Sequence, residues 1–212
     1  MIDNFDTIKS LLDFSKADTF YFIQILKRRK ENPEMKSGTS VIDNFYVYEL
    51  NDMDKLKDKI IDRCVKHNAR AYINLNKLNL EKVALYTQKH IIDCIINKDF
   101  KGVKNAYATV CGSHHSEKNK RWIIDIDGPL AEEKYMSTIK EFITKELGPG
   151  YSILADIPTK NGIHIISNPF NIEKFKIKLK QYYHYFPLSE EVKAELSRLA
   201  IQKNSPTVLY IN

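Results

Sequence analysis

The spacing of apolar and polar residues predicts a chain of alternating helices and strands. Apolar residues recur every three or four positions, as on one face of a helix, in segments 3–14, 53–67, 79–96, 131–147, 172–186 and 188–200. Runs rich in aromatic and β-branched residues predict strands at 19–26, 41–50, 69–75, 106–110, 121–127, 151–156, 162–167 and 207–211. The local alternation within 174–180 also fits a strand. The irregular order indicates an α/β or α+β fold with a mixed sheet flanked by helices.

The strongest chemical signal is an apolar strand that ends in two aspartates, Asp125 and Asp127. Residues two apart on a strand project from the same face, so both carboxylates lie together while Ile124 and Ile126 face the core. Two adjacent negative charges repel one another unless a cation neutralises them. Mg²⁺ or Mn²⁺, which prefer hard oxygen ligands, would fit there. The alternative is a strand end with two solvated aspartates.

A second signal is a polar turn that leads a histidine into an apolar strand. Alternation puts Gly162, His164 and Ile166 on one face. A glycine there would let a phosphate approach the main chain, and Thr159 and Lys160 offer a hydroxyl and a positive charge. The alternative is a β-hairpin with a half-buried histidine that is satisfied by its neighbours.

The two motifs together resemble the archaeo-eukaryotic primase superfamily, which includes primase small subunits, primase-polymerases and the polymerase domains of bacterial repair ligases. Asp125 and Asp127 match its DxD motif, and Thr159 to His164 match its second motif. The likeness is carried by 121–167 and elsewhere by strand and helix order. It implies one primase-polymerase-like catalytic domain over 1–212, with an α/β half at about 1–110 and an RRM-like half at about 111–212.

For activity, the resemblance implies a divalent-metal-dependent nucleotidyltransferase. Asp125 and Asp127 would bind Mg²⁺ or Mn²⁺ and, with His164, form the catalytic set. Thr159, Lys160 and His164 would contact the triphosphate of the nucleotide. The implied partners are a nucleoside triphosphate, single-stranded DNA or RNA, and a helicase or another replication protein.

One departure from the family pattern concerns its third motif, an acidic residue on a later strand. The last predicted strand carries no acid, and Asn212 stands where an aspartate is expected. Asp156 is a second candidate for that position. Two other functions therefore stay open: a catalytically lapsed relative that binds nucleic acid or a partner protein, and a metal-dependent nuclease that shares the DxD strand.

Charge and composition add weaker indications. The net charge of +6, from 33 basic and 27 acidic residues, permits a polyanionic partner. Basic clusters at 27–30 and 118–121 could contact phosphates, although such clusters are usually solvated loops. The lysines of 174–180, next to the aromatic residues of 182–186, could stack on single-stranded bases or pack in the core. Cys111, His114 and His115 have zinc-ligand chemistry, and the alternative is a polar loop.

Other features bear on the cellular compartment. No run of about 18 apolar residues is present, so no membrane association is expected. The acidic N-terminus lacks the pattern of a secretory signal, and three cysteines without a CxxC spacing indicate reduced thiols. We therefore expect a cytoplasmic protein. The abundance of Lys, Ile and Asn is typical of a low-GC or viral genome, which suits a phage-encoded or degenerate member of the family.

Overall fold

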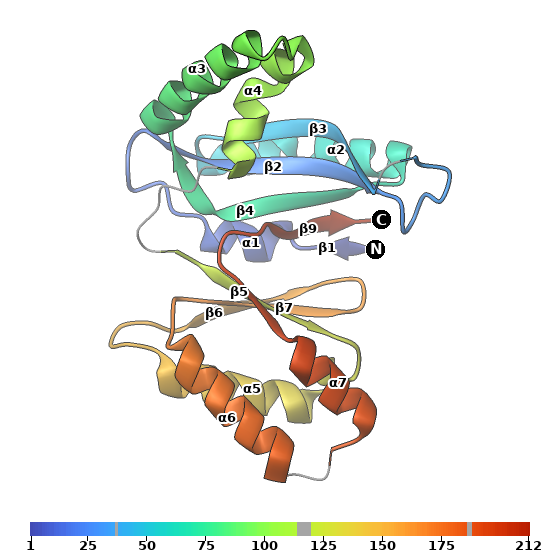
Figure 1. The fold of residues 1–212 in the computed structure, drawn as a ribbon, viewed down its shortest axis with the longest axis vertical. Coiled ribbons are helices and arrows are strands. Elements are labelled where there is room, and N and C mark those ends of the chain that lie inside the picture. Colours follow the sequence, from blue (N-terminus) through green and yellow to red (C-terminus); the bar gives the residue numbers. More distant parts are fainter. Residues whose placement is uncertain (37, 114–119, 186–187) are drawn as a thin grey trace. The chain divides into compact units, whose positions relative to one another are not determined.

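The computed structural model describes residues 1–36, 38–113, 120–185 and 188–212, apart from the side chain of Tyr183. The chain forms two compact units, each with its own sheet (Figure 1). Unit 1 comprises Met1, Asp3–Lys118 and Val208–Asn212. Unit 2 comprises Ile2 and Asn119–Thr207.

The five-stranded sheet of unit 1 has the order β1-β9-β4-β2-β3. Its strands are β1 (Ile2–Asp3), β2 (Thr19–Arg28), β3 (Thr39–Val47), β4 (Arg70–Asn79) and β9 (Thr207–Ile211). β2 pairs antiparallel with both β3 and β4. The last strand returns to this sheet, where the backbone N–H of Asn4 donates to the carbonyl of Leu209 at 3.0 Å. The two ends of the chain are thereby joined in one sheet.

Helices cover both faces of this sheet, because β2 is apolar on both sides. Phe20 and Phe22 pack on one face against α3 (Leu80–Ile96) and α4 (Phe100–Ser113). The residues that alternate with them, Tyr21 and Ile23, are also buried and point to the other face. The helices α1 (Phe5–Leu11) and α2 (Leu50–His67) lie on that side (Figure 1).

One predicted element of unit 1 is wrong. Residues 106–110 were expected as a strand, and they lie within α4. Their Ala-Tyr-Ala-Thr-Val sequence has a strand-like composition, but Ala106, Val110 and Cys111 are buried at helical spacing. Packing of this helical face against Phe20 and Phe22 decides the structure over local propensity.

Unit 2 has a four-stranded sheet with the order β6-β7-β5-β8, in which all neighbours are antiparallel. Its elements run β5 (Trp122–Asp127), a 3₁₀ turn (Gly128–Ala131), α5 (Glu133–Glu146), β6 (Ile153–Pro158), β7 (Gly162–Ser167), α6 (Ile172–Tyr185), α7 (Glu190–Arg198) and β8 (Ala200–Gln202). With α6 and α7 taken as one crossover, this is the β-α-β-β-α-β order of a split β-α-β domain.

The core of unit 2 lies between one face of this sheet and its helices. Ile124, Ile126 and Ile165 pack against apolar residues of α5, α6 and α7, among them Ile143 and Phe175. Because strand residues alternate, Asp125 and His164 must then project from the opposite face. The core thus fixes which side of the sheet carries the polar motif.

The mixed α/β class is confirmed, but the single mixed sheet is wrong. The structure has two separate antiparallel sheets and, in the described residues, seven α-helices. Two short strands, β1 and β8, were not anticipated. Among the described residues, no helix is both long and apolar enough to cross a bilayer.

Candidate functional site

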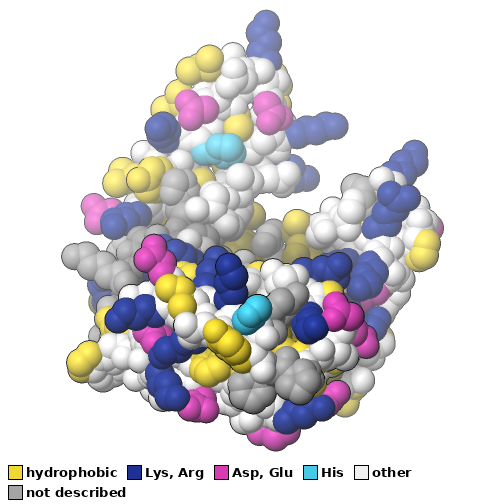
Figure 2. Space-filling view, turned by 60° about the horizontal axis from the view of Figure 1, so that its bottom comes forward, with side chains coloured by type: hydrophobic (Ala, Val, Ile, Leu, Met, Phe, Trp, Pro, Cys, Tyr) yellow, Lys and Arg dark blue, Asp and Glu magenta, His cyan; other side chains and the backbone are white. Residues whose placement is uncertain are grey.

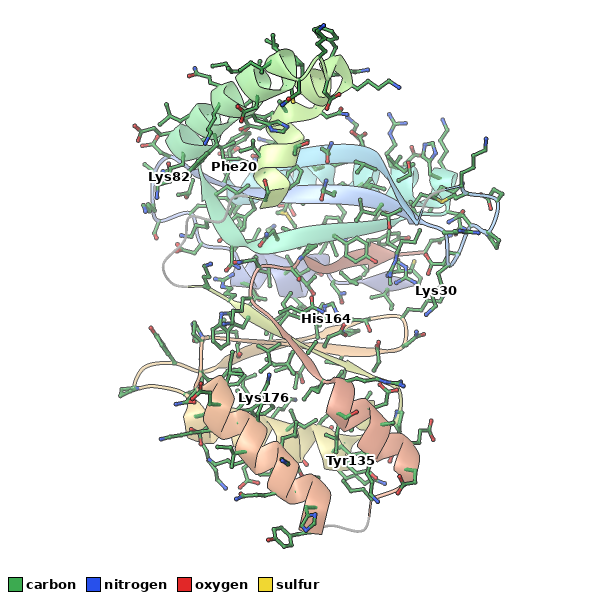
Figure 3. All side chains as sticks on the ribbon, in the orientation of Figure 1. Phe20, Lys30, Lys82, Tyr135, His164 and Lys176 are labelled. Atoms are coloured by element: carbon green, nitrogen blue, oxygen red, sulfur yellow. The ribbon has the colours of Figure 1, made fainter. Side chains whose placement is uncertain are left out.

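The centre of the candidate site is a pair of side chains on adjacent strands. Asp125 on β5 lies directly opposite His164 on the adjacent strand β7 in the antiparallel register. His164 Nε2 is 3.3 Å from Asp125 Oδ1. The histidine side chain is buried, whereas that of Asp125 keeps a third of its surface exposed. Figure 3 shows His164 on the side of the unit 2 sheet that faces away from α5, α6 and α7.

Two residues that the motifs did not indicate extend this pair into a polar row. The Gln202 side-chain amide on β8 donates to Asp125 Oδ2 at 3.3 Å. His164 Nδ1 lies 2.8 Å from the hydroxyl of Thr207, a side chain with no exposed surface. If neutral His164 donates from Nε2 to the carboxylate, its Nδ1 accepts from the Thr207 hydroxyl. Gln202, Asp125, His164 and Thr207 therefore form one continuous hydrogen-bonded row.

An acid, a histidine and a hydroxyl joined in this order also occur in nucleophilic active sites, where the hydroxyl attacks the substrate. The side chain of Thr207 has no exposed surface, and a substrate carbonyl or phosphorus could not reach the hydroxyl in this conformation. The hydroxyl instead satisfies the second nitrogen of a buried histidine. We therefore assign Thr207 a positioning role for His164.

The side chain that contacts Asp125 from the far edge of β5 is an amide. β9 lies in the unit 1 sheet between β1 and β4, so the expectation that its end, Asn212, completes the site is wrong. The strand that pairs with the other edge of β5 is β8, and its side chain next to Asp125 is Gln202. A three-residue strand that follows directly on a helix leaves little pattern in the sequence, which is why Gln202 was missed.

Asp156, the other candidate for the third position, lies on the wrong face. It pairs in register with Ile165, which belongs to the core packed against the helices. Its carboxylate forms an ion pair with Lys140 of α5. Asp156 therefore faces the helices, whereas Asp125 and His164 face away from them.

Asp127 ends β5 on the same face as Asp125 and is exposed. The chain then turns sharply, because Gly128 has a φ of +58°, a value that favours glycine. The Gly128 N–H donates to the carbonyl of Asn161 at 3.1 Å. This hydrogen bond holds the tip of the β6–β7 hairpin beside the end of β5 that carries Asp127.

Gly162 has a structural reason to be glycine. It lies opposite Asp127 in the register, and a Cβ built there would be 1.9 Å from the Ile126 carbonyl oxygen. No side chain fits at that distance without moving the backbone of β5. The close approach of these two strands therefore accounts for the glycine, whether or not a phosphate comes near it.

Thr159 and Lys160 occupy the hairpin tip. The Thr159 hydroxyl accepts from the N–H of Gly162 at 3.1 Å, and the Thr159 N–H donates to the Gly162 carbonyl at 2.9 Å. The hydroxyl thus stabilises the turn. Lys160 is exposed at the tip, and the bond between Asn161 and Gly128 places the tip next to the end of β5. Asp125 and His164 are in direct contact. The tip of the β6–β7 hairpin is held next to the end of β5 by a backbone hydrogen bond.

The zinc interpretation of Cys111 does not fit the structure. Cys111 is buried in the α4 core with Phe20 and Phe22, and burial raises the pKa of its thiol to about 12. Zinc binds the thiolate, which that environment disfavours. His114 and His115 lie outside the described residues. In the described part of the chain, no three His, Cys, Asp or Glu side chains are grouped closely enough to bind a metal ion together.

The basic and aromatic segments are partly structural. Tyr182 packs edge-to-face on Phe142, with 5.8 Å between ring centres, and Lys178 forms an ion pair with Glu146. Figure 2 shows basic, acidic and hydrophobic side chains interspersed on the helical face of unit 2. In the 27–30 cluster, Lys27 pairs with Glu34. Of the other segments, Lys118, Asn119, Phe186 and the Tyr183 side chain lie outside the described part.

No protein-family model, curated protein or solved structure matches this chain. The interpretation of the site therefore depends on its own geometry and chemistry.

Proposed function

We propose that this chain is a divalent-metal-dependent nucleotidyltransferase of the primase-polymerase type. The observation that carries the proposal is the placement of Asp125 directly opposite His164, with Asp127 two residues further along the same face. In this arrangement, two carboxylates that need a cation to neutralise them lie next to an imidazole that can donate a hydrogen bond to a phosphate. The carboxylates could bind the metal ion of a metal–triphosphate complex, and the imidazole could bind its phosphate.

The donor set is chemically suited to a hard cation. Asp125 and Asp127 supply carboxylate oxygens, and Gln202 could turn its carbonyl oxygen toward the same place as Asp125, since amide oxygens also bind such ions. Bound Mg²⁺ or Mn²⁺ would neutralise phosphate charge and polarise the reacting groups. The protein's part is to hold its two carboxylates on one rigid strand, anchored by the isoleucines of the core.

The histidine and the hairpin tip would bind the nucleotide. His164 is held from behind by the Thr207 hydroxyl, so its Nε2 stays directed toward the aspartate, where a phosphate oxygen could accept from it. Lys160 projects from a tip that is tied to the end of β5, and its ammonium group is suited to the outer phosphates. Thr159 shapes the tip and could contact a phosphate only through its hydroxyl proton.

The element order of unit 2 supports the family assignment. A β-α-β-β-α-β order with an antiparallel sheet is the arrangement expected for an RRM-like half, and the two motifs stand on its adjacent central strands. Unit 1 would then be the α/β half of a primase-polymerase-like core. Single-stranded DNA or RNA would be the acceptor, in agreement with a net charge of +6. A helicase or another replication protein as partner and a cytoplasmic location belong to the same proposal.

A catalytically lapsed binding module is the second candidate function, and Gln202 favours it. The position beside Asp125 that would hold a third acid carries an amide, which donates to the carboxylate rather than sharing a metal charge. Two carboxylates can hold one ion, but a two-metal transfer usually needs more negative charge. The lapsed form would still bind a metal–nucleotide complex and would transfer nothing.

The test compares two aspartates on opposite faces of the same sheet. Asp125→Asn removes the charge and keeps the shape, and Asp156→Asn does the same on the helical face. Binding of Mn²⁺ with a nucleoside triphosphate is measured by calorimetry, and extension of labelled single-stranded DNA is measured on gels. We expect wild type and Asp156→Asn to bind and extend, and Asp125→Asn to lose at least tenfold in both.

The outcomes separate the two candidates. Binding that depends on Asp125 without any extension establishes the lapsed module. Equal binding by Asp125→Asn and wild type contradicts both candidates. Metal-dependent cleavage of the DNA that requires Asp125 and no nucleotide would assign a nuclease instead.

A further inference from the structure

An apolar stripe runs along the outer side of α3 and continues onto the first residue of α4. It consists of five exposed side chains, which we call the α3 stripe: Leu85 (58% exposed), Ile92 (57%), Ile95 (52%), Ile96 (72%) and Phe100 (68%). A soluble surface commonly shows single exposed apolar residues, but a contiguous patch of several hundred Å² marks an interaction site. In the α3 stripe, Ile92, Ile95, Ile96 and Phe100 lie close together in the sequence, whereas the exposed Gln88 and Lys89 separate them from Leu85.

The stripe is not the packing face of the helix. Val83 and Cys94 are buried on the side of α3 that meets α4 and the sheet. At 100° per residue, Leu85 and Ile92 project from the side opposite Val83, so α3 is apolar on both sides. A helix that is apolar on two opposite sides has a second side available for packing. Figure 1 shows α3 at the outer end of unit 1, beyond α4 and the sheet.

Another helix of the same unit shows that this is a local property. The outer side of α2 carries many charged residues, as a solvated surface helix does: Asp54, Lys55, Asp58, Lys59, Asp62 and Lys66. The outer side of α3 carries exposed leucine and isoleucine beside the charged residues Lys89 and Asp93. A solvated helix does not need these apolar side chains.

The charges along α3 favour a protein helix over a lipid surface or nucleic acid. Within α3, Glu81 and Asp93 balance Lys82 and Lys89, so most of the stripe lacks the basic excess that anionic lipids or phosphates attract, and an excess of lysine (Lys98, Lys101 and Lys104 against Asp99) occurs only at its Phe100 end. From Leu85 to Ile96 the stripe extends about 16 Å, a length that one helix lying alongside can cover. The occupant is thus a helix with an apolar face and balanced charge.

We infer that the occupant is α3 of a second copy of this chain, packed antiparallel about a two-fold axis. A two-fold interface is self-complementary, because each patch meets its own copy. In an antiparallel register that sets Leu85 level with Ile96 of the second copy, Lys89 is level with Ile92, and Asp93 of the other copy lies about one residue further along the axis. The register thus brings Leu85 onto Ile96 and places opposite charges within reach of each other.

The size of the stripe suits a dimer of moderate strength. Its five side chains expose on the order of 600 Å² per copy, and each partner of a stable interface contributes roughly 800 Å². The dimer is therefore expected to exchange with monomer rather than to be permanent. The stripe lies in unit 1 and includes none of the residues of the proposed nucleotide site. The dimer inference is therefore independent of the proposed function.

The experiment measures the mass of the full chain by sedimentation velocity over a range of concentrations. Wild type is expected to pass from monomer to dimer as concentration rises. Ile96→Glu, which puts a charge opposite the apolar Leu85 of the second copy, raises the dissociation constant at least tenfold. Val65→Glu is the matched control, because Val65 is similarly exposed (51%) but lies on α2, and its dissociation constant stays at the wild-type value. Circular dichroism checks that both variants are folded.

A charge exchange tests the register. Lys89→Glu alone and Asp93→Lys alone each weaken the dimer, and the two together restore it, because the opposite charges meet again across the axis. A wild-type chain that remains monomeric at every soluble concentration overturns the inference. So does a dimer that Ile96→Glu leaves intact, or a monomer that sediments with anionic phospholipid vesicles.

Discussion

His164 and Asp125 face one another across two antiparallel strands, with Nε2 of the histidine 3.3 Å from Oδ1 of the aspartate. Each has a second partner behind it: Thr207 for the histidine and Gln202 for the aspartate. Polar groups on both sides of a buried imidazole are expected to fix its orientation, since an unpaired ring nitrogen would be costly there. The row is therefore both the candidate functional site and a structural element of unit 2.

The first prediction concerns the stability that this row supplies. His164→Leu removes both hydrogen bonds of the imidazole and leaves the Thr207 hydroxyl unpaired in the interior. The unfolding free energy should fall by about 1–3 kcal/mol, as measured by urea denaturation. Thr207→Val should cost less. In the double variant the two losses should not add, with a coupling of about 1 kcal/mol. Strict additivity would show that the hydrogen bond between them contributes nothing.

Two glycines provide a matched pair for the second prediction. A Cβ at Gly162 would meet the Ile126 carbonyl oxygen at 1.9 Å, whereas a Cβ at Gly112 in α4 would meet nothing within 4 Å. Gly162→Ala should therefore destabilise the chain by about 3 kcal/mol, because β5 and β7 must separate. Gly112→Ala should raise stability by about 0.5–1 kcal/mol, since alanine favours the helix. Melting temperatures compare the two, and equal values would contradict the close approach at Gly162.

The sequence predicts the arrangement of unit 2 well because the residues of β5 that pack against its helices are two positions apart. Ile124 and Ile126 face the helices, so Asp125 and Asp127 must face away, and the turn before Gly162 brings His164 to the neighbouring strand. Periodicity of two is enough to place these side chains. Periodicity does not predict Gln202 as the partner of Asp125, because its strand, β8, has only three residues.

Other features depend on long-range packing that no local pattern contains. Residues 106–110 look like a strand, yet contact with the aromatic residues of β2 makes them part of α4. The last strand is expected to pair beside the DxD strand, yet only its first residue, Thr207, reaches His164, and the strand itself pairs in the sheet of unit 1 beside β4. The division into two antiparallel sheets follows from such pairings. Local propensity indicates which segments are strands and does not determine which strands are neighbours.

The third prediction concerns the buried thiols. Cys64 and Cys111 have no exposed surface, and burial raises the pKa of each thiol to about 12. Both should therefore resist iodoacetamide in the folded protein at pH 8 and react once urea unfolds it, because the thiolate is the reactive form. Mass spectrometry of alkylated peptides identifies the modified positions. Rapid alkylation of Cys111 in the folded protein would contradict its place in the core.

The same thiols make stability depend on alkaline pH. Their folded pKa lies above the unfolded value, so between about pH 9 and pH 12 the folded state binds more protons than the unfolded state. The contribution to stability is fully present below pH 9 and is lost as pH rises through 12. We expect Cys64→Ala to lose stability at pH 7 by leaving a cavity and to show a shallower decline above pH 9. Denaturation curves at several pH values measure both effects.

The last prediction uses Gln202 to test whether the carboxylates of β5 can bind a cation. Gln202→Glu keeps the length of the side chain and puts a second negative charge where the amide now donates to Asp125 Oδ2 at 3.3 Å. Without metal, the two carboxylates repel one another, and the unfolding free energy should fall by about 1–2 kcal/mol. A divalent cation neutralises both, so Mn²⁺ should raise the melting temperature of this variant more than that of wild type.

Gln181→Glu, which adds the same charge at an exposed position of α6, should show the wild-type response to Mn²⁺. If wild type extends DNA weakly, Gln202→Glu should extend it faster, since an additional acid helps to hold the metal charge. An equal Mn²⁺ response in the two glutamate variants would mean that Asp125 does not lie in a cation site.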